Sequence, residues 1–459
     1  MAKAALKLGM SPHIYDQAAE GKLVKRDLLD EARQLGVPVT LEWDGSLALG
    51  TDSLVVNPAV RREHPFLAAS LEQGADVIGE IEFAYRICKA PIVAITGTNG
   101  KSTTTVMTYL CLRACGIEAV LCGNIYGSGY PEAPLTEAAS NSSPEQVLVA
   151  EISSFQLEWI RDFSPVAAGI TNIWPDHLDR HASFREYAET KQKLFMNMRE
   201  GDFVVIRAND PVVVPPGGEG SRFVARGRRR YPSQTEAKSL PTVLTFGATG
   251  EYARVEERDL VVFGRKVPLD SLPFHEPHNY QNAAMALLLA SGALAVRAKG
   301  RWPVEELCEC LVDGLRTFRG LEHRMETVGE RGGVRVINNS MCTNPDAVIK
   351  SVQAVRDRTH ILMGGVNKEL DFGPLRHYLA NHRHQPYLYG TDAVKLNAML
   401  GGGFPIYGSL QEAFSAAAEA AREGEVVMLA PGCASTDSFK DFRDRGNVFK
   451  AIATDWLRS

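Results

Sequence analysis

The stretch Ile92–Cys115 constrains this chain more than any other, because a strand, a glycine-containing turn and a helix follow one another directly in it. Its first four residues are an apolar run, which is typical of a fully buried strand. The turn reads Thr-Gly-Thr-Asn-Gly-Lys-Ser-Thr, and apolar residues then recur at helical spacing up to Gly116. Glycine lets backbone N–H groups approach phosphate oxygens, and a helix N-terminus adds partial positive charge. This order of elements predicts a site for a nucleoside triphosphate.

The residues expected to hold the nucleotide lie in this turn and in the first turn of the helix. They are Gly97, Thr98, Asn99, Gly100, Lys101, Ser102 and Thr103. Lys101 is expected to reach the outer phosphates, and the Ser102 hydroxyl is expected to ligate magnesium. The spacing departs from the usual phosphate loop, since Ile95 stands where that motif has its first glycine. An ordinary turn before a helix is the alternative, which the strand and the long helix around it disfavour.

The length of 459 residues predicts two or three domains. Short strands and helices alternate along the chain, which predicts an α/β fold. We expect a Rossmann-like domain at 1–90, a central P-loop ATPase-like domain at 91–317 and a Rossmann-like α/β domain at 318–459. The first residues, MAKAALKLGM, are typical of the middle of a helix. The first strand and glycine turn of a Rossmann-like domain are therefore expected to be missing.

The composition excludes several classes of protein. A formal net charge of -5 argues against a general nucleic-acid binder. No run of about eighteen apolar residues is present, and the first residues lack the apolar core and cleavage site of a signal peptide. The eight cysteines show no paired Cys-x-x-Cys spacing, which favours free thiols in a reducing compartment. We therefore expect a cytoplasmic protein that neither binds nucleic acid nor inserts into a membrane.

Two further strands end in residues that can do chemistry. The strand 147–150 leads to Glu151, and a carboxylate at the carboxyl end of a parallel strand lies at the ligand face of an open α/β sheet. Together with Ser102, Glu151 would give magnesium two hard oxygen ligands. Helix capping by this serine-rich stretch, which includes Ser153, is the alternative. His177 follows the next strand among acidic residues, although a lone histidine is more often structural or on the surface.

Eight ordered motifs of the chain resemble the Mur ligase family, whose members join amino acids to cell-wall precursors, and five of them are the longest continuous stretches. They are TGTNGKST at 96–103, EISSFQLE at 151–158, TNIWPDHLD at 171–179, GLEHRME at 320–326 and PGCASTDSFKDFRDRG at 431–446. The second matches the pattern of the members that add D-glutamate. The resemblance runs from about residue 10 to residue 459 and implies the three domains expected above.

The resemblance also implies roles that the sequence pattern leaves unassigned. Lys191 falls where the family carries a lysine carbamylated by carbon dioxide, and with His177 it would ligate a second magnesium ion. Asn279 and Asn282 match the family's adenine motif, with helix capping by Asn279 as the alternative. Arg324 falls where an arginine meets the phosphates of ATP.

Further residues are implied on the substrate side. Asp16 and Asn57-Pro58 resemble contacts to the uridine part of the substrate, with loop capping by Asp16 as an equal alternative. Asn124 resembles an asparagine that faces the substrate, although on its own it would be a turn residue. The full set implied to meet the cell-wall precursor or the incoming amino acid is Asp16, Asn124, Ser153, His177, Thr343, Lys368, Ser435 and Phe442.

The segment 338–344 departs from the family, because it reads NNSMCTN where the D-glutamate-adding members usually have NDSKATN. Asn339 replaces an aspartate that holds the ATP ribose, and it can still hydrogen-bond hydroxyl groups without charge assistance. Met341 replaces a lysine near the phosphates and cannot supply its charge. These departures, with the missing first strand, modestly favour a ligase for another amino acid or acceptor.

The resemblance implies a monomeric, ATP-dependent ligase that adds D-glutamate to UDP-N-acetylmuramoyl-L-alanine with ATP and two magnesium ions. The precursor's carboxylate would become an acyl phosphate, which the amine of glutamate then attacks. The implied catalytic residues are Lys101, Glu151, His177, carbamylated Lys191 and Arg324. A nucleotide-binding protein with weak or no ligase activity is a further alternative, which the presence of all these residues argues against.

Overall fold

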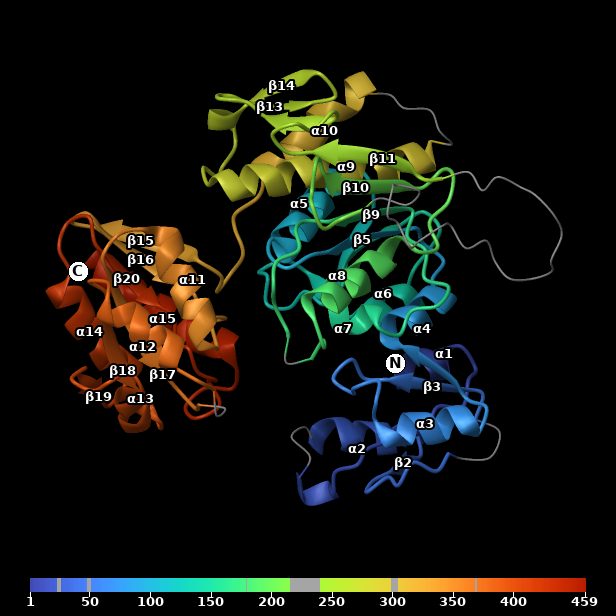
Figure 1. Ribbon diagram of the computed structural model, residues 1–459, viewed down its shortest axis with the longest axis horizontal. Helices are drawn as coiled ribbons and strands as arrows, with labels where there is room; N and C mark the ends of the chain where they lie inside the picture. Colours follow the sequence, from blue (N-terminus) through green and yellow to red (C-terminus); the bar gives the residue numbers. More distant parts are fainter. Residues whose placement is uncertain (23–25, 48–50, 179, 215–239, 299–303, 368–369) are drawn as a thin grey trace. The chain divides into compact units, whose positions relative to one another are not determined.

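The structure is a computed structural model that describes residues 1–22, 26–47, 51–178, 180–214, 240–298, 304–367 and 370–459, with the side chains of 304–308 left out. These residues form two compact units, which are described separately. Unit 1 is Met1–Tyr126 with Tyr130–Arg319, and unit 2 is Gly127–Gly129 with Gly320–Ser459. Both units are α/β, as predicted (Figure 1). A domain boundary at residue 90 falls inside unit 1 and stays a prediction.

The first part of unit 1 is built on two short parallel ladders, β1 with β2 and β3 with β4. Its elements are α1 Ala2–Lys7, β1 Ile14–Tyr15, η1 Glu20–Lys22, α2 Arg26–Gln34, β2 Val39–Thr40, β3 Ser53–Val56, α3 Pro65–Glu72, β4 Asp76–Gly79 and α4 Glu80–Ile87. The helix predicted for the first residues is therefore present. The α2 helix buries Leu29 and Ala32, three residues apart, and exposes its charged face.

The rest of unit 1 is organised around a ten-stranded sheet in the order β14-β13-β12-β11-β10-β9-β5-β8-β6-β7. Its strands are β5 Ile92–Thr96, β6 Ala119–Gly123, β7 Glu132–Ala133, β8 Val147–Glu151, β9 Ala167–Ile170, β10 Phe203–Arg207, β11 Thr242–Phe246, β12 Ala253–Val255, β13 Asp259–Val262 and β14 Arg265–Pro268. Neighbours pair in parallel from β12 to β7, and β13 is antiparallel to both β12 and β14.

The strand β5 lies between β8 and β9, and this position assembles the site. Ile95 is in register with Glu151 of β8 and with Gly169 of β9. Because parallel strands end at the same edge of a sheet, the glycine turn after β5, Glu151 and the residues after β9 come together there. Every residue of β5 and β8 is buried, as the apolar runs predicted.

Helices cover both faces of this sheet, with α5, α9 and α10 on one face and α4, α6, α7 and α8 on the other (Figure 1). Their bounds are α5 Lys101–Ala114, α6 Leu135–Ser140, α7 Ser154–Leu157, α8 Phe184–Gln192, η2 Lys193–Phe195, η3 Leu269–Ser271, α9 Pro277–Arg297 and α10 Val304–Arg316. Fourteen of the residues of α9 are buried, so the helix is apolar almost all round. The phosphate turn is thus held between a buried strand and two buried helices.

Unit 2 contains a six-stranded sheet in the order β15-β16-β20-β17-β18-β19, in which only β15 is antiparallel to its neighbour. Its elements are β15 Glu326–Arg331, β16 Val334–Asn338, α11 Pro345–Val355, β17 Thr359–Gly364, α12 Gly373–Ala380, β18 Gln385–Tyr389, α13 Ala393–Met399, β19 Ile406–Tyr407, α14 Leu410–Ala420, β20 Val426–Leu429 and α15 Phe442–Arg458. The carboxyl ends of β16, β17 and β20 meet at one edge, where most of the predicted glutamate-side residues lie.

The prediction that all cysteines are free thiols is wrong for one pair. Cys115, which follows α5, forms a disulfide with Cys310 of α10, and their Cα atoms are 5.1 Å apart. The two residues are 195 positions apart in the sequence, so only the packing of α10 against α5 brings them together. Among the described cysteines, Cys88, Cys111, Cys122, Cys342 and Cys433 are free thiols.

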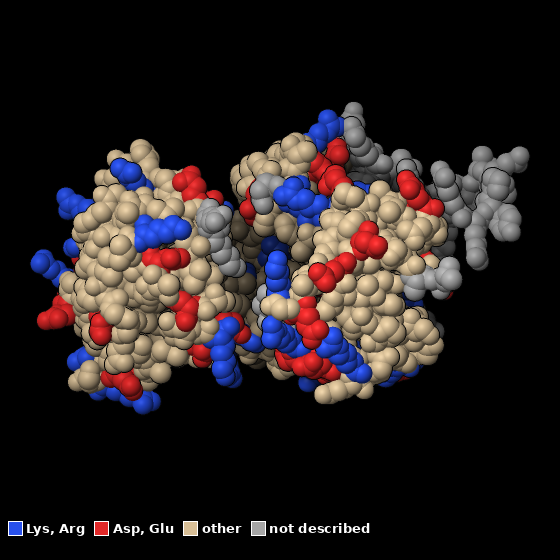
Figure 2. Space-filling view, turned by 90° about the horizontal axis from the view of Figure 1, so that it is seen from below, with Lys and Arg blue, Asp and Glu red and all other residues tan. Residues whose placement is uncertain are grey.

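On the face shown in Figure 2, the basic and acidic side chains of the described residues are interspersed. This mixture agrees with the small net charge of -5. Within the described ranges, no helix is both long enough and apolar enough to cross a lipid bilayer.

Candidate active site

The turn between β5 and α5 requires glycine at two positions. Gly97 has φ +146°, and a Cβ atom there would lie 1.9 Å from Thr171 Oγ1. Gly100 is the N-cap of α5 with φ +80°, and a Cβ atom there would lie 2.5 Å from Asn282 Oδ1. A side chain is therefore excluded by both backbone conformation and space. This geometry places the turn directly before the N-terminus of a long helix, a position suited to phosphate binding.

Side chains of the turn form hydrogen bonds with its own backbone and with the residues that pack against it. Lys101 Nζ donates to Thr98 O at 2.9 Å, so the lysine folds back over the turn. Thr98 Oγ1 donates to Trp174 O at 3.2 Å and lies 3.1 Å from Tyr187 Oη. Thr103 lies in the first turn of α5, as the sequence indicates. The predicted phosphate-binding residues thus form one continuous structure with the loop after β9.

Two residues after β9 hold the phosphate turn, and the sequence analysis did not assign them this role. Asn99 N donates to Asn172 Oδ1 at 3.0 Å, and Asn172 Nδ2 donates back to Asn99 O at 3.0 Å. Thr171 Oγ1 also donates to Asn99 O, at 2.6 Å. The sequence signals were the position of Thr171-Asn172 at a strand end and at the start of the stretch TNIWPDHLD. Asn172 thereby fixes the middle of the turn through a pair of reciprocal hydrogen bonds.

Replacing Asn172 by alanine is expected to raise the KM for ATP about 10-fold, because loss of a positioning hydrogen-bond pair typically costs about 1–2 kcal/mol. Steady-state kinetics at varied ATP concentration measures this change. Asn197→Ala is the matched control, since Asn197 Nδ2 also donates to two carbonyls, Arg161 O and Phe163 O, but away from the turn. An equal change of KM in both variants would contradict the role of Asn172.

The predicted pair for the first magnesium ion is assembled. Ser102 Oγ donates to Glu151 Oε2 at 2.6 Å, and both side chains are buried. Asn124 Nδ2 donates to Glu151 Oε1 at 3.0 Å, so this asparagine orients the carboxylate. A carboxylate and a hydroxyl beside a phosphate-binding turn are hard oxygen donors of the kind that magnesium prefers. The residues present therefore fit magnesium.

Lys191 is buried, in contrast to the surface position that is usual for lysine. Its side chain lies over the ring of Tyr187, and Nζ donates to Gly97 O at 2.7 Å. Burial, assisted by the charge of Lys101, lowers the pKa of Lys191 to about 7, although Asp176 and Glu151 oppose this shift. A neutral amine is the form that reacts with carbon dioxide. The environment of Lys191 therefore fits the predicted carbamylation, which stays a prediction.

His177 is half exposed and has a left-handed backbone, with φ +52°. Its Nε2 lies 3.8 Å from Asp176 Oδ2. The centroid of its ring lies 5.0 Å from the centroid of the Phe155 ring and 6.3 Å from that of the Tyr187 ring. His177 and Lys191 are thus both neighbours of Tyr187. Among the described residues, no group of three or more His, Cys, Asp or Glu side chains is assembled for a metal ion. The second magnesium site stays a prediction.

Two of the structural alternatives are confirmed. Ser153 is the N-cap of α7 and forms a capping box with Gln156. Asp16 Oδ1 accepts a hydrogen bond from Ala18 N at 2.8 Å, which is the loop cap considered above. Neither observation tests whether these residues also meet the substrate, so their binding roles stay predictions.

The predicted adenine residues Asn279 and Asn282 are joined, since Asn282 Nδ2 donates to Asn279 Oδ1 at 3.2 Å. Asn282 Oδ1 also accepts from Thr104 Oγ1 at 3.4 Å, which links α9 to α5. The alternative that Asn279 caps α9 is wrong, because Glu276 is the N-cap and Asn279 Nδ2 donates to its carboxylate at 3.0 Å. The pair thus lies on the first two turns of α9, with Asn282 beside Gly100 of the phosphate turn.

In unit 2, the two positions that depart from the family pattern make internal contacts. Arg324 Nη2 donates to Met341 Sδ at 3.0 Å. Asn339 is buried, and its Nδ2 donates to Ser351 Oγ at 2.7 Å while its Oδ1 accepts from Met325 N at 3.2 Å. Each end of the Asn339 amide therefore makes one internal hydrogen bond, and its contact with the ATP ribose stays a prediction. Contact of Arg324 with ATP stays a prediction.

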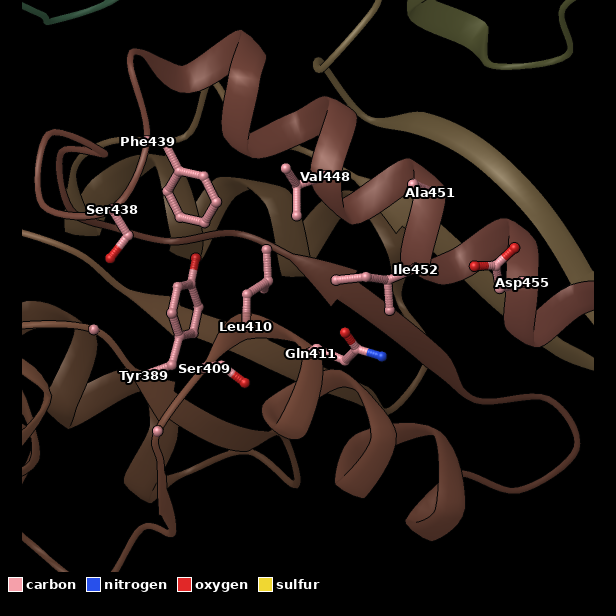
Figure 3. A pocket seen from close by; sticks show the side chains of 12 residues that line it. Tyr389, Ser409, Leu410, Gln411, Ser438, Phe439, Val448, Ala451, Ile452 and Asp455 are labelled. Carbon is pink, nitrogen blue, oxygen red and sulfur yellow. The ribbon is translucent and has the colours of Figure 1, made fainter.

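The predicted glutamate-side residues of unit 2 lie after neighbouring strands. Thr343 follows β16, Ser435 is buried after β20, and Phe442 begins α15, with its carbonyl accepting from Ser340 Oγ. Lys368 lies outside the described residues. A cavity of about 550 Å³ lies nearby between β18, α14 and α15 (Figure 3). Tyr389 and Phe439 lie at one end of it and Asp455 at the other, and no predicted site residue lines it.

The comparisons with known proteins agree with this geometry. Residues 95–290 match the Mur ligase middle domain, and residues 323–433 match the family described as Mur ligase, glutamate ligase domain. The chain is 34% identical to the UDP-N-acetylmuramoylalanine–D-glutamate ligase of Caldanaerobacter subterraneus, over 100% of this chain and 96% of that protein. This chain belongs to the Mur ligase family. It is also 35% identical to the enzyme of that name from Pelotomaculum thermopropionicum, over 92% of this chain and 88% of that one.

Solved Mur ligase structures share the fold. The UDP-N-acetylmuramate–alanine ligase MurC of Thermotoga maritima has a TM-score of 0.53 at 19% identity and covers 99% of this chain and 96% of its own. The MurF ligase of Thermotoga maritima, in complex with ADP, has a TM-score of 0.53 at 16% identity and covers 89% of this chain and 96% of its own. At these identities the likeness establishes the Mur ligase fold.

Proposed function

We propose that this Mur ligase adds D-glutamate to UDP-N-acetylmuramoyl-L-alanine, with ATP as the second substrate, in the synthesis of peptidoglycan precursors. The observation that carries the proposal is the contact of Ser102 with Glu151 beside a glycine turn at the N-terminus of α5. The names of the relatives that match almost the whole chain supply the substrates. The chain acts in the cytoplasm as a monomer.

In the first step, the alanyl carboxylate of the precursor attacks the terminal phosphorus of ATP, and an acyl phosphate and ADP form. Backbone N–H groups in the first turn of α5 bind the phosphates at the helix N-terminus. Lys101, which covers the turn, swings from Thr98 O to the outer phosphates, and Arg324 adds a second positive charge. Asn279 and Asn282 bind the adenine. The positive charges offset the charge that develops on the transferred group.

Two magnesium ions, when bound, would neutralise phosphate oxygens and so lower the barrier to phosphoryl transfer. Ser102 and Glu151 would hold one of them, and Asn124 keeps the carboxylate of Glu151 in position. His177 and carbamylated Lys191 would hold the other. Carbamylation converts the Lys191 amine into an anion, and the low pKa of the buried amine supports this reaction.

In the second step, the amine of D-glutamate attacks the acyl carbon, the amide bond forms and phosphate leaves with its electron pair. Thr343, Lys368, Ser435 and Phe442 bind the glutamate, while Asp16, Asn124, Ser153 and His177 bind the precursor. The buried thiol of Cys433 takes no part, since burial raises its pKa to about 12. Exclusion of water protects the acyl phosphate from hydrolysis.

The test is phosphate release from ATP, magnesium and UDP-N-acetylmuramoyl-L-alanine with D-glutamate, L-glutamate or no amino acid. We expect phosphate release with D-glutamate to exceed release with L-glutamate or with no amino acid by at least about 100-fold. The reason is that a wrong substrate leaves buried polar groups of the site without hydrogen-bond partners. Release only with another amino acid would show that the chain is a Mur ligase for that amino acid, which the departures at Met341 and Asn339 would allow. Nucleotide binding without release under any condition would refute the ligase.

A further inference from the structure

One buried cation in unit 1 joins segments that lie far apart in the sequence. The side chain of Arg180 is 8% exposed. Its Nη1 donates to Ala59 O at 2.9 Å, and its Nη2 donates to Pro58 O at 3.1 Å and to Val60 O at 2.8 Å. Three consecutive backbone carbonyls therefore converge on one guanidinium group. A guanidinium group has five N–H donors in a fixed plane, so it can bind these three carbonyls and a carboxylate at once, whereas a lysine ammonium has only three donors.

The same guanidinium group binds Glu158 on its other side. Nε and Nη2 of Arg180 donate to the two carboxylate oxygens at 3.1 and 2.8 Å, and the Glu158 side chain is 7% exposed. The guanidinium carbon also lies 4.9 Å from the centroid of the Phe155 ring. Arg180 is thus fixed by charge, hydrogen bonds and an aromatic face at once, which is more than a surface ion pair provides.

The main chain of Arg180 adds a third connection, because Arg180 N donates to His177 O at 3.0 Å. The ring of Phe155, on which the guanidinium group lies, is itself 5.0 Å from the His177 ring. The Arg180 side chain therefore contacts the ring that packs against His177, while its main chain bonds to the His177 carbonyl. His177 needs such support, since its left-handed backbone is unfavourable for histidine.

The segment 57–60 that Arg180 holds is a tight turn directly after β3. Ala59 N donates to Asn57 Oδ1 at 2.9 Å, and Val60 N donates to Asn57 O at 2.9 Å. These bonds use the N–H groups of the turn within the turn itself and leave its carbonyls for Arg180. The turn is also the segment whose Asn57-Pro58 resembles the uridine-side contacts.

We propose that Arg180 is a positioning residue that couples the 57–60 turn, on the nucleotide-sugar side, to His177 on the reaction side. The proposal rests on the proposed function, because that function makes 57–60 and His177 two ends of one substrate. Arg180 itself meets neither substrate nor ATP. Its role is to place His177 correctly when the uridine part of the precursor is bound.

Two variants separate the contacts of Arg180. Arg180→Lys keeps a positive charge beside Glu158 but loses most of the bonds to the carbonyls, whereas Glu158→Gln keeps the arginine and all three carbonyl bonds. We expect Arg180→Lys to raise the KM for UDP-N-acetylmuramoyl-L-alanine about 10-fold and to lower kcat about 10-fold, as loss of a supporting contact behind a functional residue typically does. Glu158→Gln is expected to change both by less than about threefold, and the KM for ATP is expected to stay the same in both variants.

Arg86→Lys is the matched control, because Arg86 also holds two carboxylates of unit 1 but touches neither the turn nor His177. Its Nε donates to Glu82 at 3.0 Å and its Nη1 donates to Asp76 at 2.7 Å. A merely structural role would lower the melting temperature in Arg180→Lys and Arg86→Lys alike and leave the KM for the precursor unchanged in both. That result would overturn the proposal.

Hydrogen exchange with UDP as the added ligand tests the coupling without turnover. In the wild-type protein, UDP is expected to slow exchange both in the peptide with residues 57–60 and in the peptide with His177. In Arg180→Lys, UDP is expected to slow exchange only in the first. Slowing of both peptides in the variant would overturn the coupling while the proposed function stands. No slowing in the wild-type peptide with 57–60 would refute the proposed substrate side, and the coupling with it.

Discussion

Replacing Lys191 by methionine is expected to lower D-glutamate-dependent phosphate release by about 1,000-fold, because the variant cannot be carbamylated and a magnesium ligand is lost. The same substitution is expected to raise the free energy of unfolding at pH 7. The pKa of Lys191 is about 7 when folded, against 10.5 for an ordinary lysine. Holding this amine in the folded protein is costly at neutral pH, so its removal stabilises the protein by on the order of 2 kcal/mol after loss of the bond to Gly97 O.

The pH dependence of this gain has a definite sign. Below pH 7 the Lys191 amine is protonated in both the folded and the unfolded state, and the buried charge lowers the free energy of unfolding of the wild type by its full amount. Between pH 7 and about 10.5 only the unfolded state binds the proton, so wild-type stability rises with pH and the advantage of Lys191→Met shrinks. Urea unfolding of both proteins, free of carbon dioxide, at several pH values measures this convergence. A constant difference across that range would contradict the lowered pKa.

Lys193→Met is the matched control for activity, because Lys193 lies two residues further along and is not assigned to the site. We expect it to retain wild-type phosphate release within about twofold, as is usual for a residue outside the site. Removal of carbon dioxide and its restoration with bicarbonate should lower and restore the activity of the wild type and of Lys193→Met. Full activity of Lys191→Met would show that neither the amine nor its carbamate is needed.

Replacing Gly97 by alanine is expected to lower kcat/KM for ATP by about 100- to 1,000-fold. The new Cβ atom would overlap Thr171 Oγ1, and φ +146° is unfavourable for any residue but glycine. The turn must then move, which displaces the N-terminus of α5, the proposed phosphate site, and also Gly97 O, the acceptor for Lys191. Steady-state kinetics together with ADP binding by calorimetry would separate lost binding from lost turnover.

Gly116→Ala is the control for backbone strain alone. Gly116 follows the other end of α5 with φ +75°, and a Cβ atom there would meet no atom of the described residues within 4 Å. We expect this variant to lose about 1 kcal/mol of stability and to keep its affinity for ATP, since only the left-handed backbone is affected. Equal loss of ATP affinity in the two variants would mean that helix stability, rather than the shape of the turn, governs binding.

The sequence predicted the parts of the fold that depend on local patterns. The apolar runs that lead to Gly97 and to Glu151 are the buried strands β5 and β8, and both glycines of the turn have the positive φ angles that the motif needs. The helix after Pro277 is present as well. Strand periodicity and turn chemistry are properties of neighbouring residues, so they can be inferred without knowledge of the fold.

The resemblance to a family carried the assignment further than the pattern did. Lys191 and Asn282 look like a surface lysine and an ordinary helical residue, and only the family suggested a role for each. The structure then gave the physical basis, since Lys191 is buried against Tyr187 and Asn282 lies beside Gly100. The internal use of the Asn339 amide, by contrast, could not be foreseen from its position in a motif.

The sequence by itself determined that the chain has a glycine turn between a buried strand and a helix, an α/β fold and the residues of a Mur ligase. Only the tertiary structure decided which distant residues support them: Asn172 behind Asn99, Asn124 behind Glu151, Arg180 between the 57–60 turn and His177, and Cys115 joined to Cys310. The physical reason is that local geometry follows from adjacent residues, whereas burial, pKa and hydrogen-bond partners depend on which strands and helices pack together.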